Sequence, residues 1–153
     1  MKKLIMSLAL LSACRTTTTT VPSPARTAAI SGSQTGAPDP AGAVQGFMSA
    51  AKLTDLQALA AFWGDKDGPA RDRLPRQELE QRELVMMRCL RHDSYMITGD
   101  APAVGGARAM VVTLNLGEVS RSADVQVVRG PSERWYVKDV SLPKLNDICM
   151  RRS

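Results

Sequence analysis

The sequence lacks the residue sets on which common catalytic and cofactor-binding motifs depend. It contains one histidine, His92, and no serine in the context of a nucleophile elbow, so a serine–histidine–acid triad is excluded. It also contains no glycine-rich loop of the kind that cradles phosphate. We therefore predict no catalytic constellation, no cofactor and no metal site. A non-enzymatic role is favoured, and catalysis is left open.

A long hydrophobic run is absent from the N-terminal region. The apolar stretch from Leu4 to Leu11 is far shorter than the roughly 20 residues that a membrane-spanning helix needs. It follows Lys2 and Lys3, and a charged start followed by a short apolar run is typical of a secretory signal.

The apolar run leads into the residues LSAC, of which Cys14 is the last. They resemble the lipobox of bacterial lipoproteins, which implies a signal peptide over residues 1–13 and a lipid-modified Cys14 as the mature N-terminus. Several acyl chains would anchor the protein stably to a membrane. Arg15, rather than an aspartate, after the cysteine implies the outer membrane, with the protein facing the periplasm. The alternative is an ordinary secretory signal that has a cysteine by chance.

Residues 14–38 are rich in Thr, Ser, Pro, Gly and Ala and poor in large apolar side chains. Such a segment buries too little surface to offset the entropy of ordering it, so we predict a disordered tether. Residues 39–153 are then one folded domain.

A strong excess of positive charge is also absent from this domain. From Ala43 onward the chain has 4 Lys and 12 Arg against 14 acidic residues, a net charge of +2. This balance indicates a mixed, solvated surface, so a nucleic-acid partner is not expected.

Cysteine is scarce, and two remain in the domain, Cys89 and Cys149. In an oxidising envelope such a pair indicates a disulfide. A reactive thiol, or a metal held by Cys89 and His92, is the alternative, but two ligands fall short of a zinc site.

The domain begins with helical patterns. Asp39 and Pro40 are start signals for a first helix, and Thr54 with Gln57 matches a capping box for a second. Asp65 to Pro69 forms a turn cluster, in which calcium binding would need more oxygen ligands. A third helix begins at Pro75 and places Leu79, Met86 and Leu90 on one face.

Alternating patterns follow the helices. Strands are expected over residues 94–99, 107–119, 122–130 and 133–142. In the last of these the apolar phase shifts near Lys138 and Asp139, which predicts a bulge. The fold class is α+β, with three N-terminal helices packed on a curved, cone-like, four-stranded antiparallel sheet.

This layout resembles the nuclear transport factor 2-like fold, also called the cystatin-like cone. FMSAAKLTDLQALAAFWGD (residues 47–65) is similar to the first two helices of that family, and ERWYVKDV (residues 133–140) to its tryptophan-bearing final strand. The resemblance implies an apolar cavity between helices and sheet. Family members include isomerases and cyclases of hydrophobic molecules as well as binding and assembly modules.

The polar residues expected to reach such a cavity are Tyr95, Tyr136 and Asp139. His92, at the corner between helix and strand, is expected at the surface or as a cap. We predict a membrane-anchored envelope lipoprotein that binds a protein or an apolar ligand without catalysis. The alternatives are an isomerase- or cyclase-type enzyme acting on a hydrophobic substrate and a structural homodimer.

Overall fold

The computed structural model describes residues 35–151. Cys14, the signal sequence and most of the predicted tether lie outside these residues. The elements are α1 (Pro40–Leu53), α2 (Leu56–Phe62), β1 (Gly64–Asp65), β2 (Gly68–Pro69), α3 (Arg76–Cys89), β3 (Ser94–Pro102), β4 (Arg108–Leu116), β5 (Val119–Arg129), β6 (Trp135–Val140) and α4 (Asn146–Cys149). The predicted α+β class and the four-stranded antiparallel sheet, in the order β3-β4-β5-β6, are confirmed. Within the described residues, no helix is both long enough and apolar enough to cross a membrane.

Helix α1 begins where the sequence signals place it. The Asp39 carboxylate accepts a hydrogen bond from the Gly42 N–H at 2.7 Å, and Pro40 occupies the first turn. The helix ends at Thr54, whose φ of 56° is left-handed. Thr54 is therefore the end of α1 and not the start of α2, so the predicted capping box is wrong. Asp55 caps α2 instead and accepts from the Ala58 N–H at 3.0 Å.

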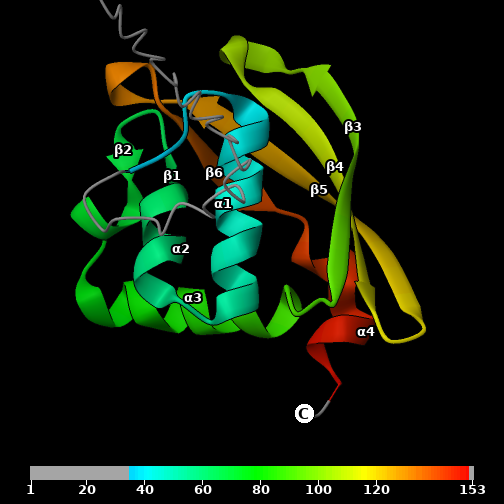
Figure 1. Ribbon diagram of the computed structural model, residues 1–153. Coiled ribbons are helices and arrows are strands. Elements are labelled where there is room, and N and C mark those ends of the chain that lie inside the picture. The colour runs from blue at the N-terminus through cyan, green and yellow to red at the C-terminus, as the bar shows by residue number, and fades with distance from the viewer. Residues whose placement is uncertain (1–34, 152–153) are drawn as a thin grey trace, which may run out of the picture.

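The sheet is a meander with one buried and one solvated face, as is common for antiparallel sheets. Met110, Val112 and Leu114 of β4 lie on the buried face, and α1 packs on it against β5 and β6 (Figure 1). On the opposite face, the hydroxyl of Thr113 lies 2.8 Å from that of Ser122. The predicted strand over residues 107–119 is broken by a turn at Gly117, where φ is 58°.

The predicted bulge in the last strand is confirmed. Gln126 pairs with Asp139 while the next residue, Val127, pairs with Val137, so Lys138 is the extra residue. The bulge explains the phase shift in the sequence, because it returns Val140 to the buried face.

The outer edge of β6 is covered by two other segments. Ala37 pairs with Trp135 through hydrogen bonds of 2.9 and 2.8 Å, and Trp63 forms a bridge to Val137. Ala37 is buried. Residues 35–38, which were predicted to belong to the tether, are thus part of the folded domain, and β6 is not left as an open edge.

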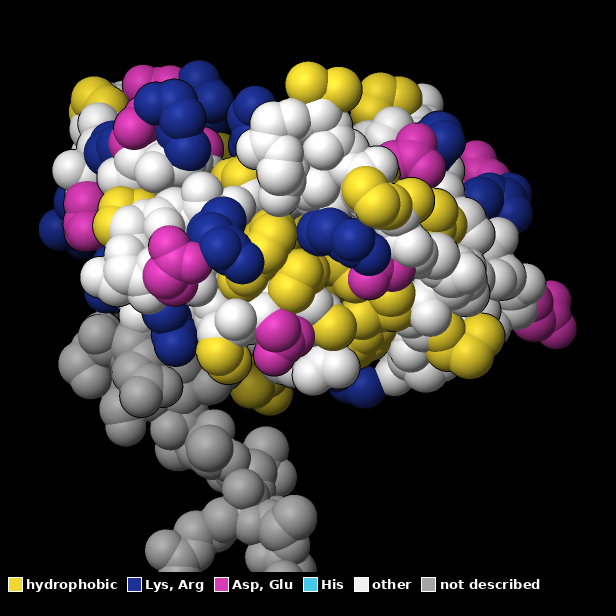
Figure 2. All heavy atoms as spheres, turned by 90° about the horizontal axis from the view of Figure 1, so that it is seen from above, with side chains coloured by type: hydrophobic (Ala, Val, Ile, Leu, Met, Phe, Trp, Pro, Cys, Tyr) yellow, Lys and Arg dark blue, Asp and Glu magenta, His cyan; other side chains and the backbone are white. Residues whose placement is uncertain are grey.

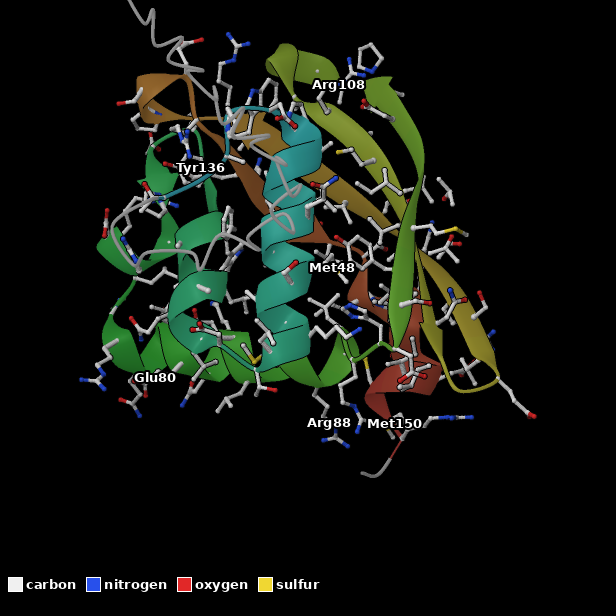
Figure 3. The ribbon with its side chains drawn as sticks, in the orientation of Figure 1. Met48, Glu80, Arg88, Arg108, Tyr136 and Met150 are labelled. Carbon is white, nitrogen blue, oxygen red and sulfur yellow. A yellow bond between two sulfur atoms is a disulfide. The ribbon has the colours of Figure 1, made fainter. Side chains whose placement is uncertain are left out.

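The space between α1 and the sheet is filled by side chains. Met48 points from α1 toward the sheet in Figure 3 and, like Phe47, is at most 1% exposed. Gly46 lies where α1 contacts α2, and a Cβ there would come within 2.4 Å of the Phe62 ring. The core is continuous from the helices to the buried face of the sheet.

Gly46→Ala is expected to lower the free energy of unfolding by roughly 1–3 kcal/mol, because the added methyl group overlaps Phe62. Urea denaturation followed by circular dichroism measures this change. Gly42→Ala is the matched control on the same helix, since its Cβ would meet no atom closer than 3.3 Å. Equal stability losses in the two variants would contradict the close approach of α1 and α2.

The two cysteines of the domain are brought together as predicted. The Sγ atoms of Cys89 and Cys149 are at bonding distance, 2.12 Å, and join the end of α3 to α4. The short helix α4 was not predicted. It is further held by Arg88, whose Nε donates to the Cys149 carbonyl at 2.7 Å.

Candidate functional site

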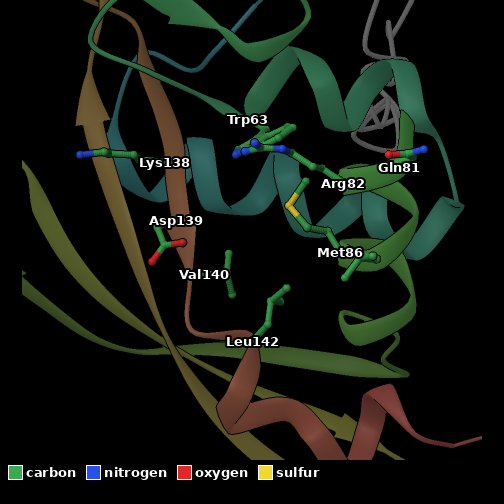
Figure 4. Close-up of a pocket in the computed structure, with 9 residues that line it drawn as sticks. Trp63, Gln81, Arg82, Met86, Lys138, Asp139, Val140 and Leu142 are labelled. Atoms are coloured by element: carbon green, nitrogen blue, oxygen red, sulfur yellow. The ribbon is translucent and has the colours of Figure 1, made fainter. Parts of the chain in front are cut away.

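A groove with a volume of about 410 Å³ lies between α3 and β6. Its apolar walls come from Trp63, Val85, Met86, Val140 and Leu142. In Figure 4 the Met86 side chain on α3 faces Val140 and Leu142 across the groove, with Trp63 at one end. This volume lies within the range of small-molecule sites, which are usually concave and mostly apolar.

Local structure places each wall of the groove. Trp63 ends α2 and is fixed by its bridge to Val137. The bulge at Lys138 turns Val140 toward α3, and α3 presents Met86 one turn after Arg82. The groove therefore depends on the end of α2, on the bulge and on one face of α3.

Charged groups surround the groove. Arg82 is ion-paired with Glu78 on its own helix. Lys138 and Asp139 are exposed, and none of the ion pairs formed within residues 35–151 includes either of them. Asp139, predicted as a cavity residue, thus lies at the border of the groove, where its side chain is exposed to solvent.

The other two predicted cavity residues lie elsewhere. Tyr136 is buried, and its hydroxyl lies 3.3 Å from that of Thr35, near the end of the molecule opposite Arg88 (Figure 3). Tyr95 is half-buried on β3. Burial raises the pKa of its hydroxyl, and a hydrogen bond with Ser49 opposes this rise. Neither tyrosine lines the groove, so the structure does not bring the three residues together.

His92 was expected at the surface or as a cap; the surface position is wrong, whereas its contact with Leu90, the residue that ends α3, agrees with a capping role. The side chain is 6% exposed, and its ring packs edge-on against Tyr95 with centroids 5.3 Å apart. Nδ1 lies 2.7 Å from the Leu90 carbonyl oxygen. Because a carbonyl only accepts, Nδ1 carries the hydrogen and donates. Nε2 is buried and has no hydrogen-bond partner among the described residues.

Glu83 is a second buried titratable group, and it was not among the residues predicted from the sequence. It is 1% exposed, and its Oε1 has no hydrogen-bond partner among the described residues. Burial raises the pKa of the carboxyl to about 7, and nearby Glu80 adds to the rise. Its signal was present in the sequence, because Leu79, Glu83 and Met86 follow the spacing of one helix face.

No group of three or more His, Cys, Asp or Glu side chains within residues 35–151 is placed to hold a metal ion. The Asp65–Pro69 segment forms the turn of the β1–β2 hairpin, where the Asp65 carboxylate accepts from the Asp67 N–H at 2.8 Å and pairs with Arg73. The carboxylate of Asp65 is thus engaged within the chain.

Comparisons of this chain with protein-family models, with curated proteins and with solved structures yield no match.

Proposed function

We propose that this chain is a lipid-anchored lipoprotein of the bacterial outer membrane whose domain binds an apolar ligand, without catalysis, in the groove between α3 and β6. The groove carries the proposal, because it exposes Val85 and a partly buried Leu142 on opposite walls of one concave surface. Its volume suits a small apolar molecule better than a broad protein interface.

The chemistry of the groove favours binding over catalysis. A proton-transfer enzyme needs an acid or base within hydrogen-bond reach of the substrate and a pKa suited to the task. Asp139 is exposed at the border of the groove, and the two tyrosines and His92 lie outside it. Anchoring is supported by the LSAC motif that ends at Cys14.

We also propose that the domain is a nuclear transport factor 2-like cone. The supporting features are the order of the elements, with α1, α2 and α3 before the sheet, and the bulges at Thr98 and Lys138. Bulges bend strands and increase their twist, as a curved sheet requires.

Binding is tested with the full chain and the neutral fluorescent probe N-phenyl-1-naphthylamine. We expect saturable fluorescence enhancement, and we expect Val85→Glu to weaken binding at least about tenfold, because it places a charge against Met86 and Leu142. Leu84→Glu is the matched control. Leu84 is 59% exposed on the same helix, compared with 55% for Val85, but it does not line the groove.

Equal probe binding by the two variants would place the apolar site elsewhere and overturn the proposal. Absence of probe binding by the unmodified chain would do the same. Probe binding that Val85→Glu removes and Leu84→Glu leaves intact would support it.

A further inference from the structure

A second pocket, separate from the groove, lies where α1 and α3 end and the β4–β5 turn approaches the C-terminal residues. Its volume is about 580 Å³, and it shares no residue with the groove. Four of its nine lining residues are cationic, and no aspartate or glutamate lines it; the cations are Lys52, Arg88, Arg91 and Arg151. The opposite end of the molecule differs, because Figure 2 shows basic and acidic side chains intermixed there.

We propose that this basic pocket binds the phosphate group of a small molecule. Its cations come from three separate parts of the chain, and its wall includes the buried imidazole of His92, whose Nε2 has no partner among the described residues. Arginine presents several N–H donors in a planar fork that suits phosphate.

The contacts that Lys52 and Arg88 make within the protein do not neutralise their charge. The Nζ of Lys52 donates to the Asp93 carbonyl at 2.5 Å, and Arg88 donates through Nε to the Cys149 carbonyl at 2.7 Å. These acceptors are neutral. Within residues 35–151, neither Lys52, Arg88 nor Arg151 takes part in any of the ion pairs.

The disulfide assembles this pocket. It fixes Cys149 beside Cys89, so that Arg151, two residues after one cysteine, lies near Arg88, which precedes the other. The Arg151 side chain extends toward the β4–β5 turn, with Nη1 3.6 Å from the position of a Cβ on Gly117. In Figure 3, Arg88 and Met150 lie together at this end of the molecule.

Protonation of His92 is coupled to binding. Its Nδ1 already donates to the Leu90 carbonyl, so protonation adds a hydrogen at the buried Nε2 and a positive charge to an imidazole that lines the pocket. The pKa of His92 lies below its ordinary value, chiefly because the imidazole is buried. Lys52 lowers the pKa further, whereas the Leu90 carbonyl and Asp93 raise it. The other charged groups of the pocket are Arg88, Arg91 and Arg151, and an anion among these cations would raise the pKa of His92. Affinity should therefore fall as pH rises.

Isothermal titration of the full chain with inorganic phosphate near pH 6 tests the proposal. We expect binding that weakens with added salt and that Lys52→Gln/Arg151→Gln weakens at least about tenfold. The matched control is Arg76→Gln/Arg129→Gln, which removes the same charge from exposed ion pairs elsewhere. Arg151→Glu alone is the second variant, because within residues 35–151 the side chain of Arg151 makes none of the observed hydrogen bonds.

Sulfate, whose charge is constant between about pH 5 and 8, tests the coupling to His92. Its affinity should fall as pH rises in the unmodified chain, and His92→Gln should remove most of this dependence. A pH dependence that persists in His92→Gln would overturn the role of the imidazole.

Vesicles distinguish the two sources of the phosphate group. Binding to phosphatidylglycerol vesicles but not to phosphatidylcholine vesicles, lost in Lys52→Gln/Arg151→Gln, would support a lipid headgroup as the ligand. Phosphate binding without vesicle binding would support a soluble phosphate ester. Equal phosphate affinity in the basic-pocket variants and the control, or no binding to phosphate or anionic vesicles, would overturn the proposal.

Discussion

Removing the disulfide between Cys89 and Cys149 is expected to lower the free energy of unfolding by roughly 4 kcal/mol. The cysteines are 60 residues apart, so the bond closes a loop that contains β3, β4, β5 and β6. In the chain-entropy account, opening such a loop gives the unfolded chain far more conformations. The double variant Cys89→Ser/Cys149→Ser, compared with the unmodified chain in urea denaturation, measures the loss.

A second effect separates this prediction from general destabilisation. Without the bond, α4 is held by the Arg88 and Arg91 donors to its carbonyls and by packing of the buried Ile148. These contacts are weaker than a covalent bond, so Arg151 should be held less firmly in the basic pocket, and phosphate affinity should fall together with stability. The unmodified chain under reducing conditions serves as a control and should match the double variant. A stability loss below about 1 kcal/mol would show that the loop is constrained without the bond.

The sequence predicted those features that depend on local chemistry or on periodicity. The cap at Asp39 needs only its own carboxylate and the N–H three residues later, so neighbouring residues suffice to recognise it. The bulge at Lys138 was detectable because the apolar pattern changed phase there, and the disulfide because two cysteines remained in the domain. The α+β class followed from the change from helical to alternating periodicity.

The features that depend on tertiary contacts were missed. Nothing in TGAP, residues 35–38, indicates that Ala37 pairs with Trp135 about 100 residues later. The burial of His92 likewise depends on β3, which brings Tyr95 against the imidazole. Thr54 could have ended α1 or started α2. In the structure it adopts the left-handed conformation that ends α1, and α2 is capped by Asp55 instead.

The candidate sites were predicted less well than the fold, for the same reason. Met86 and Val140 were recognised as apolar, but only the packing of α3 beside β6 shows that they face a groove. The basic pocket had one usable signal, because a Cys89–Cys149 bond requires Arg88 and Arg151 to be close. The proximity of Arg88 and Arg151 can be inferred only after the disulfide has been assigned, and the residue pattern around either arginine does not indicate it.

The free energy of unfolding is expected to fall by about 3 kcal/mol between about pH 4.5 and pH 7 because of Glu83. In the unfolded chain this carboxyl has its ordinary pKa of 4.5, whereas burial raises its pKa in the folded protein to about 7. Between these values the folded state binds more protons than the unfolded state. Stability is therefore retained below pH 4.5, declines through this window, and changes no further with this group above pH 7.

Glu83→Gln tests this origin, because the amide is close in size to the protonated acid and does not ionise. The variant should match the unmodified chain near pH 4.5 and exceed its stability by about 2–3 kcal/mol at pH 8. Glu118→Gln is the control, since it removes one carboxylate from an exposed position in the β4–β5 turn. Urea denaturation at several pH values gives both curves. Parallel stability profiles of the unmodified chain and Glu83→Gln across this window would contradict the prediction. They would show that the ionised carboxylate is stabilised in the folded protein, by water or by a shift of Arg71 or Arg76, which line the same pocket as Glu83.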